Sequence, residues 1–489
     1  MKLAPLPSPR GAPSGFVLLA VLVFIVLMSM VTISLLFSSR AEETATAASA
    51  GAEQAWSAAM SGVDEALRVA ATTPAGSLEW QDQPAVFRQR LVYEDGSDQW
   101  FFTVYSAADS ESTAEVRHGL TDEASRVNLN RPGAADLANI PRMTPTLAQA
   151  VQRFVGSSTV SSPVLPRLIP DEGGPAADSL LDPVTDPGAG VSVRDALSAH
   201  GPLASIGELL QVPGFSWSLL YGEDANLNGR LDPNENDGDQ QFPPDNQDSH
   251  LDRGMAQYFT VRSSETPLTR DGQKRINLNQ PGAALAGLDL PPAFTNYLAA
   301  LQVAKVTLTH PAEVLEAHVK VKNEQGQEAE VPSGITKEEL PRVLDLFTTE
   351  TAPRREGLIN LNTANAFVLA TLPGVDLSLA ESMVSARSSL SPERRSTIAW
   401  LFQDGVVDAA QFKRLAPQLT TRSFQFQFRV VGYGVPSGRY RVLEAEIDVA
   451  GGQRRVTGLR DITKLGIPFR LIGDELPTTA MAGISPPPR

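Results

Sequence analysis

The chain contains no cysteine and only five histidines among its 489 residues. The lack of cysteine excludes disulfide bonds, thiolate zinc sites and thiol catalysis. Basic residues are also few, 41 against 56 acidic ones, so the formal net charge is −15. Such a charge disfavours nonspecific binding to nucleic acid, whose phosphates attract basic surfaces. No Ser/His/Asp constellation and no phosphate-binding glycine loop stands out in the sequence.

One segment lacks charge altogether. Residues 16–37 contain no charged residue and no proline. A helix of this length, rising 1.5 Å per residue, spans about 33 Å and can cross a bilayer core of about 30 Å. The only charged residues before this segment, Lys2 and Arg10, are both basic. The positive-inside rule therefore predicts an N-terminus in the cytoplasm, with the bulk of the chain on the other side of the membrane.

Three interpretations of this segment compete. A secretory signal peptide has a shorter apolar core and a small-residue cleavage site, which residues 45–47 could supply. A plain membrane anchor requires only the apolar run. The third interpretation rests on Gly15, which follows a short basic leader and directly precedes Phe16. This start resembles that of type IV prepilins and pseudopilins, and the resemblance implies cleavage by a prepilin peptidase between Gly15 and Phe16.

The rest of the pattern predicts a helix packed on an antiparallel sheet. Alanine, a strong helix former, is frequent over residues 38–72, and we expect one helix continuous with the anchor, ended by Pro74 and Gly76. Its predicted packing stripe consists of Trp56, Met60, Val63, Leu67 and Ala70. Alternating apolar residues or turn residues mark strands at 85–93, 99–105, 115–120, 424–430, 439–449 and 453–460.

These elements predict an α+β fold, with a long N-terminal transmembrane helix on an antiparallel sheet and a large, mainly α-helical insertion. A chain of this length is expected to hold two or three domains. The predicted parts are a leader peptide (1–15), a transmembrane helix (16–37), the N-terminal half of the sheet domain (38–120), the insertion (121–420), the C-terminal strands (421–470) and a disordered tail (471–489). Residues 156–199 are rich in Ser, Pro, Gly and Asp and are expected to form a long loop.

The predicted insertion carries an internal repeat. An Asn-Leu-Asn motif occurs within residues 127–130, 276–279 and 359–362. We expect its second asparagine to be the N-cap of a following helix. Two helix–turn–helix units, at 206–221 and 364–387, resemble the helix–hairpin–helix of DNA-binding proteins. A compact packing unit is favoured instead, because in the second unit Asp376 follows the turn and the nearest basic residue, Arg387, is two helical turns away.

The strongest chemical signal is a twelve-residue acidic loop. Oxygen-bearing residues at positions 1, 3, 5, 9 and 12, with glycine at position 6, match the calcium-binding loop of EF-hands. The predicted ligands are Asp224, Asn226, Asn228, Arg230 through its carbonyl, Asp232 and Glu235. Five further aspartates follow up to Asp252, and a second calcium ion bound by some of them is a further prediction. The expected cofactor is calcium.

Taken together, these features resemble the K-type minor pseudopilin of type II secretion (general secretion pathway protein K). Most relatives carry glutamate at the fifth mature position, where this chain has Ala20, and the K-type subunits are the members that lack it. Further shared features are residues 122–130, the acidic calcium segment and residues 359–364 with the Leu-Pro-Gly turn that follows.

The resemblance implies a pseudopilin fold and a place at the tip of a short pseudopilus that serves protein export. It implies a structural and initiating component, not an enzyme. The implied partners are the I- and J-type minor pseudopilins, the major pseudopilin and prepilin peptidase, and not nucleic acid. The implied location is the bacterial inner membrane, with a single span and the bulk of the chain in the periplasm. Two alternatives remain open: a membrane-anchored helix–hairpin–helix DNA receptor, and a minor pilin of a type IV pilus.

Overall fold

The fold was analysed in a computed structural model. It describes residues 14–108, 116–131, 137–156, 201–229, 231–238, 240–285, 287–322 and 328–468. Most of the expected leader, the expected loop from residue 157 onward and the expected tail lie outside these residues.

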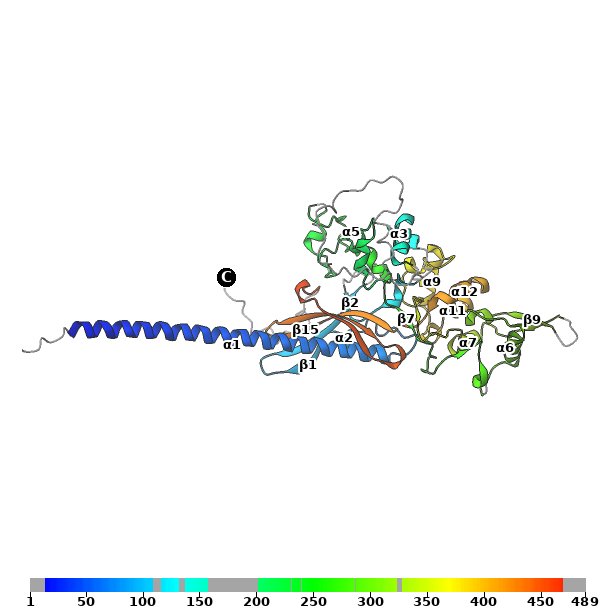
Figure 1. The fold of residues 1–489 in the computed structure, drawn as a ribbon, viewed down its shortest axis with the longest axis horizontal. Coiled ribbons are helices and arrows are strands. Elements are labelled where there is room, and N and C mark those ends of the chain that lie inside the picture. Colours follow the sequence, from blue (N-terminus) through cyan, green and yellow to red (C-terminus); the bar gives the residue numbers. More distant parts are fainter. Residues whose placement is uncertain are drawn as a thin grey trace, which may run out of the picture.

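A single long helix, α1 (Ser14–Thr72), contains both the apolar segment and the alanine-rich segment. Residues 17–50 are all exposed, and Figure 1 shows this half of α1 extending away from the rest of the molecule. The exposed half is long and apolar enough to cross a membrane, a criterion that a signal sequence at this position would also meet. The helix ends just before Pro74, which cannot donate a backbone hydrogen bond.

The second half of α1 packs on an antiparallel sheet whose strands come from both ends of the sequence. The strand order is β1 (Arg90–Glu94), β2 (Gln99–Ala107), β15 (Gln425–Val435), β16 (Tyr440–Asp448) and β17 (Arg455–Asp461). The central pairing joins β2 to β15, with Val104 opposite Val430. Two short strands complete the sheet: β3 (Val116–Arg117) beside β2 and β4 (Thr121–Asp122) beside β15.

Two strand predictions need correction. The expected strand at 85–93 begins instead with a helical turn, α2 (Pro84–Phe87), and only then enters β1. Proline at the first helical position is favourable there because its missing N–H has no partner to lose. The expected strand at 115–120 is reduced to β3 among the described residues, because the backbone at Gly119 packs against Gln81 O and leaves the strand path.

The contact between α1 and the sheet depends on small residues. Ala55, Ala58 and Ala59 are completely buried, whereas Trp56 and Met60 from the predicted stripe are only partly buried. A Cβ atom at Gly432 of β15 would lie 2.2 Å from Ala55 O and 2.3 Å from Ala59 N. Helix and strand backbones therefore touch directly. All five residues of the predicted stripe contribute to the core under α1, Val63 and Ala70 as buried residues and the other three as partly buried ones, and the alanines extend it.

The segment between β4 and β15 contains three units of similar design. Each begins with an Asn-Leu-Asn strand that pairs in parallel with a later strand ending in threonine. The pairs are β5 (Val127–Asn128) with β6 (Phe259–Thr260), β8 (Ile276–Asn277) with β11 (Phe347–Thr348), and β13 (Ile359–Asn360) with β14 (Leu419–Thr420). Helical segments fill the chain between the two strands of each pair, so each unit closes on itself.

The helices of the first unit include α3 (Pro145–Val155), η3 (Ile206–Gln211) and α5 (Trp217–Tyr221), and those of the second include α6 (Pro292–Ala304) and α7 (Leu340–Leu346). The third unit contains α8 (Ala366–Leu369), α9 (Leu377–Ser388), α10 (Pro392–Arg395), α11 (Trp400–Gln403) and α12 (Ala409–Leu415). A hairpin of β9 (His318–Lys322) and β10 (Glu328–Pro332) projects from the second unit (Figure 1). The first and third units share one large core, which also takes in Ala312, Leu315, Leu340 and Leu344 of the second unit, and the second unit has a further core of its own.

The asparagines of the repeat do not act as the predicted helix caps. In each unit the first asparagine's Oδ1 accepts from the backbone N–H of the second asparagine, at 3.0, 2.9 and 2.9 Å. The second asparagine reaches a distant segment: Asn130 exchanges two hydrogen bonds with the backbone of Leu203, and Asn279 does the same with Leu308. The motif therefore closes each unit, and the cap of α8 is Asn365.

Candidate metal site

The predicted calcium loop lies between α5 and β6, within the first unit. Of its six predicted ligand residues, the structure brings together Asp224, Asn226, Asn228, Asp232 and Glu235, while Arg230 lies outside the described residues. The backbone reverses direction where Leu227 and Gly229 have φ values of 58° and 75°. Glycine adopts such a conformation without steric cost, which is why it recurs at this position of calcium loops.

Backbone N–H groups hold the first and last predicted ligands. The carboxylate of Asp224 accepts from Asn228 N at 3.0 Å and from Gly229 N at 2.9 Å. The carboxylate of Glu235 accepts from Ala225 N at 2.8 Å and from Asp232 N at 2.9 Å. Burial raises the pKa of both carboxyl groups, and these hydrogen bonds act in the opposite direction. The loop therefore gathers two shielded carboxylates around its centre.

The middle ligands point at one another. Asn226 Nδ2 and Asn228 Nδ2 both donate to Asp232 Oδ2, at 2.9 and 2.8 Å. The two amide groups thus present nitrogen, not oxygen, to the carboxylate. Within the described part of the chain, no three Asp, Glu or His side chains form a cluster that could hold a metal by themselves. A calcium ion would need the amides to turn their oxygens inward, and the donor set, all hard oxygens, fits calcium chemistry once they do.

The described acidic residues after the loop form turns and an ion pair, and no second cluster is found among them. Asp245 accepts from the backbone N–H groups of Asp237 and Gly238, and Asp252 forms an ion pair with Arg142 at 2.5 Å. Asp239 lies outside the described residues. A second calcium site therefore stays a sequence prediction without a ligand set.

One residue that contacts the loop was not predicted from the sequence. Arg429 in β15 donates from Nη1 to Asn228 O at 2.7 Å and from Nη2 to Leu227 O at 2.6 Å. It lies 201 positions from Asn228 in the sequence, so local patterns cannot reveal the contact. The only sequence signal is that an arginine interrupts an otherwise apolar and amide-rich strand.

The helix–hairpin–helix unit of the third repeat uses its polar residues internally. Asp376 caps α9 by accepting from Leu379 N at 2.8 Å. Arg387, the basic residue nearest to the turn, donates to the carbonyl oxygens of Leu361 and Ala364 at 2.8 and 2.5 Å. These contacts serve packing, and they leave this arginine committed to carbonyl groups of its own chain.

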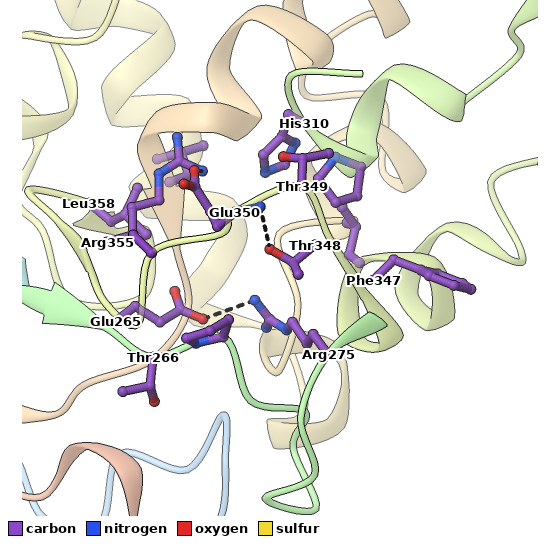
Figure 2. Close-up of a pocket in the computed structure, with 15 residues that line it drawn as sticks. Glu265, Thr266, Arg275, His310, Phe347, Thr348, Thr349, Glu350, Arg355 and Leu358 are labelled. Atoms are coloured by element: carbon purple, nitrogen blue, oxygen red, sulfur yellow. Dashed lines mark hydrogen bonds and ion pairs between the residues drawn. The ribbon is translucent and has the colours of Figure 1, made fainter. Parts of the chain in front are cut away.

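A polar cavity of about 60 Å³ lies at the junction of the second and third units (Figure 2). Each of the two arginines that line it is paired with a carboxylate: Arg275 with Glu265 at 3.2 Å and Arg355 with Glu350 at 3.1 Å. Burial, together with the two guanidinium groups, lowers the pKa of His310 to about 3. The imidazole is therefore neutral at neutral pH, and its Nδ1 accepts from Ala312 N at 3.1 Å.

Gly15 and Phe16, the predicted cleavage site, lie in the first turn of α1. A comparison of the sequence with protein-family models and with curated proteins finds no match.

Proposed function

We propose that the protein is a K-type minor pseudopilin at the tip of a type II secretion pseudopilus, where it initiates or caps assembly for protein export. The observation that carries the proposal is α1 itself. Its exposed apolar half continues without a break into a half that packs on an antiparallel sheet. A subunit of this design is held in the inner membrane by one end of the helix and presents its folded part in the periplasm.

Two features of the chain favour a position at the tip: the residue at the fifth mature position and the bulk of the inserted units. In a pseudopilus the fifth-position glutamate of an entering subunit pairs with the N-terminal amine of the subunit above it, and an unpaired charge inside the membrane is costly. Phe16 would offer an amine, but Ala20 offers no carboxylate. The inserted units lie beside and beyond the sheet, on the side away from the apolar half of α1 (Figure 1). Their bulk would obstruct a subunit stacked above.

The decisive test is the stoichiometry of purified filaments. We expect this chain in few copies per filament, in complex with the I- and J-type minor pseudopilins and above many copies of the major pseudopilin. Quantitative mass spectrometry against labelled peptides measures the ratio. Ala20→Glu is expected to raise the ratio only slightly, because the inserted units remain. A ratio near one to one would exclude the tip position.

Calcium is the proposed cofactor of the 224–235 loop. Because calcium would bind the folded loop and not the unfolded chain, it should raise the thermal stability of the protein by mass action. The change is measured as the difference between melting curves recorded with calcium and with chelator. Glu235→Ala removes a ligand with two oxygens and should abolish most of the difference, whereas Asp271→Asn, an exposed position outside the acidic segment 224–252, should preserve it. Equal melting curves for the wild type would refute calcium binding.

A further inference from the structure

Arg429 connects the candidate calcium loop to the sheet. Its neighbours Phe428 and Val430 belong to the core that faces α1, so its own side chain points to the opposite face of the sheet. There the guanidinium donates to two consecutive carbonyl groups of the loop, Leu227 O at 2.6 Å and Asn228 O at 2.7 Å. The planar fork of an arginine suits two neighbouring acceptors, a geometry that lysine cannot reproduce.

The guanidinium is held in place from the side of the sheet. Arg429 stands directly opposite Glu444 in β16, and its Nε lies 3.5 Å from Glu444 Oε2. Glu444 stands opposite Arg460 in β17 and forms a second ion pair with it. The side chains of Arg429 and Glu444 are 22% and 13% exposed, so the contact is shielded from solvent. The arginine is therefore oriented before any ligand arrives.

The two carbonyls that Arg429 contacts belong to the reversal of the loop. Leu227, which is not a glycine, has a φ of 58°. This backbone conformation costs free energy for a leucine and persists only where the surrounding structure holds it. Turning these carbonyls toward the sheet leaves the side chains of Asp224, Asn226 and Asn228 on the inner side of the loop. Arg429 thus stabilises the backbone conformation in which the predicted ligands converge.

We propose that Arg429 is a positioning residue for cation binding, which preorganises the loop and couples calcium binding to the docking of the first unit on the sheet. The inference rests on the calcium site proposed above. Because such coupling is reciprocal, calcium bound in the loop also strengthens the attachment of the inserted unit to the sheet. The attachment joins segments that are 201 positions apart in the sequence.

A purely electrostatic role predicts the opposite behaviour. A guanidinium close to the loop repels a calcium ion, so its removal alone would tighten calcium binding. Two variants separate the roles: Arg429→Lys keeps the charge but not the fork, and Arg429→Gln removes both. Positioning requires that both variants weaken calcium binding. Repulsion alone requires that Arg429→Lys resemble the wild type and that Arg429→Gln bind more tightly.

The experiment is calorimetric titration of CaCl₂ into the detergent-solubilised full chain after chelator has been removed. We expect both variants at position 429 to weaken calcium binding about tenfold. Arg441→Gln, which removes an arginine of β16 paired with Asp461 at 3.0 Å, is the matched control and should bind as the wild type does. Hydrogen exchange without calcium should be faster at Asn228 N and Gly229 N in both variants, with β15 and β16 unchanged.

The outcomes separate the two proposals. A wild type that takes up no calcium refutes the calcium site and this inference together. A wild type that binds calcium, with an Arg429→Gln variant that binds equally or more tightly, refutes the role of Arg429 alone. Loss of exchange protection throughout β15 in both variants would show that Arg429 acts through the stability of the sheet, and would also overturn the inference.

Discussion

Gly432→Ala is expected to separate α1 from the sheet. The new methyl group would lie 2.2 Å from Ala55 O, 2.3 Å from Ala59 N and 2.9 Å from Ala59 Cα. All three are backbone atoms of a helix, so no side-chain rotation relieves the overlap, and the helix must move away by more than an ångström. Overpacking of a core costs about 1–3 kcal/mol, and we expect about 3 kcal/mol here because the obstruction is backbone.

Hydrogen exchange of the amides in residues 52–72 measures this local stability. A loss of about 3 kcal/mol corresponds to a rise in exchange rate of roughly a hundredfold, since each 1.4 kcal/mol is a factor of about ten. Gly458→Ala in the edge strand β17 is the control, because there the new methyl group meets only the flexible side chain of Glu446, at 3.1 Å. If the amides of residues 52–72 exchange at the same rate in both variants, the close approach of α1 to β15 at Gly432 is wrong.

Two further predictions concern the cleavage of the N-terminus and the loss of stability at low pH. N-terminal sequencing of membrane-extracted protein should begin at Phe16; a start at Met1, or near position 47, would rule out prepilin processing. The lowered pKa of His310 means that the folded state resists protonation there. Its contribution to stability is complete above about pH 6.5 and is lost as the pH falls toward 3. With allowance for partial exposure, wild type should lose about 1 kcal/mol by pH 5 relative to His310→Asn, which keeps an N-cap group. Urea titrations of the two proteins above pH 6.5 and at pH 5 would measure the loss of unfolding free energy in each. Equal losses for wild type and His310→Asn would contradict the prediction.

The sequence was informative where patterns are local. The length of α1, the turn between β1 and β2 and the alternation along β15 all follow from neighbouring residues. The predicted packing stripe does face the core, but it omitted the fully buried Ala55, Ala58 and Ala59, because large apolar residues were favoured over alanine. Close approach of a helix to a strand requires small residues, and only the position of Gly432 opposite Ala55 and Ala59 makes that visible.

In the candidate site, too, local spacing was predictive and contacts between distant segments were not. The spacing of oxygen-bearing residues predicts the loop from Asp224 to Glu235, and the structure brings the described ligands together. The partner strands of the Asn-Leu-Asn motifs were missed because their separation from the motif differs in each unit. Arg429 was missed because its contact with the loop joins two segments remote from each other in the sequence.

The pairing of β2 with β15 has a consequence for the order of folding. The strands that cover α1 arrive from opposite ends of the chain, and closing a flexible loop of about 300 residues costs about 5 kcal/mol in chain entropy beyond a constant term. The three units close on themselves, and Ser423 then donates to Asp122 at 2.8 Å across 301 positions. Folding of the units first would bring β4 and β15 together and remove most of that entropic cost. Until then the alanine face of α1 stays uncovered.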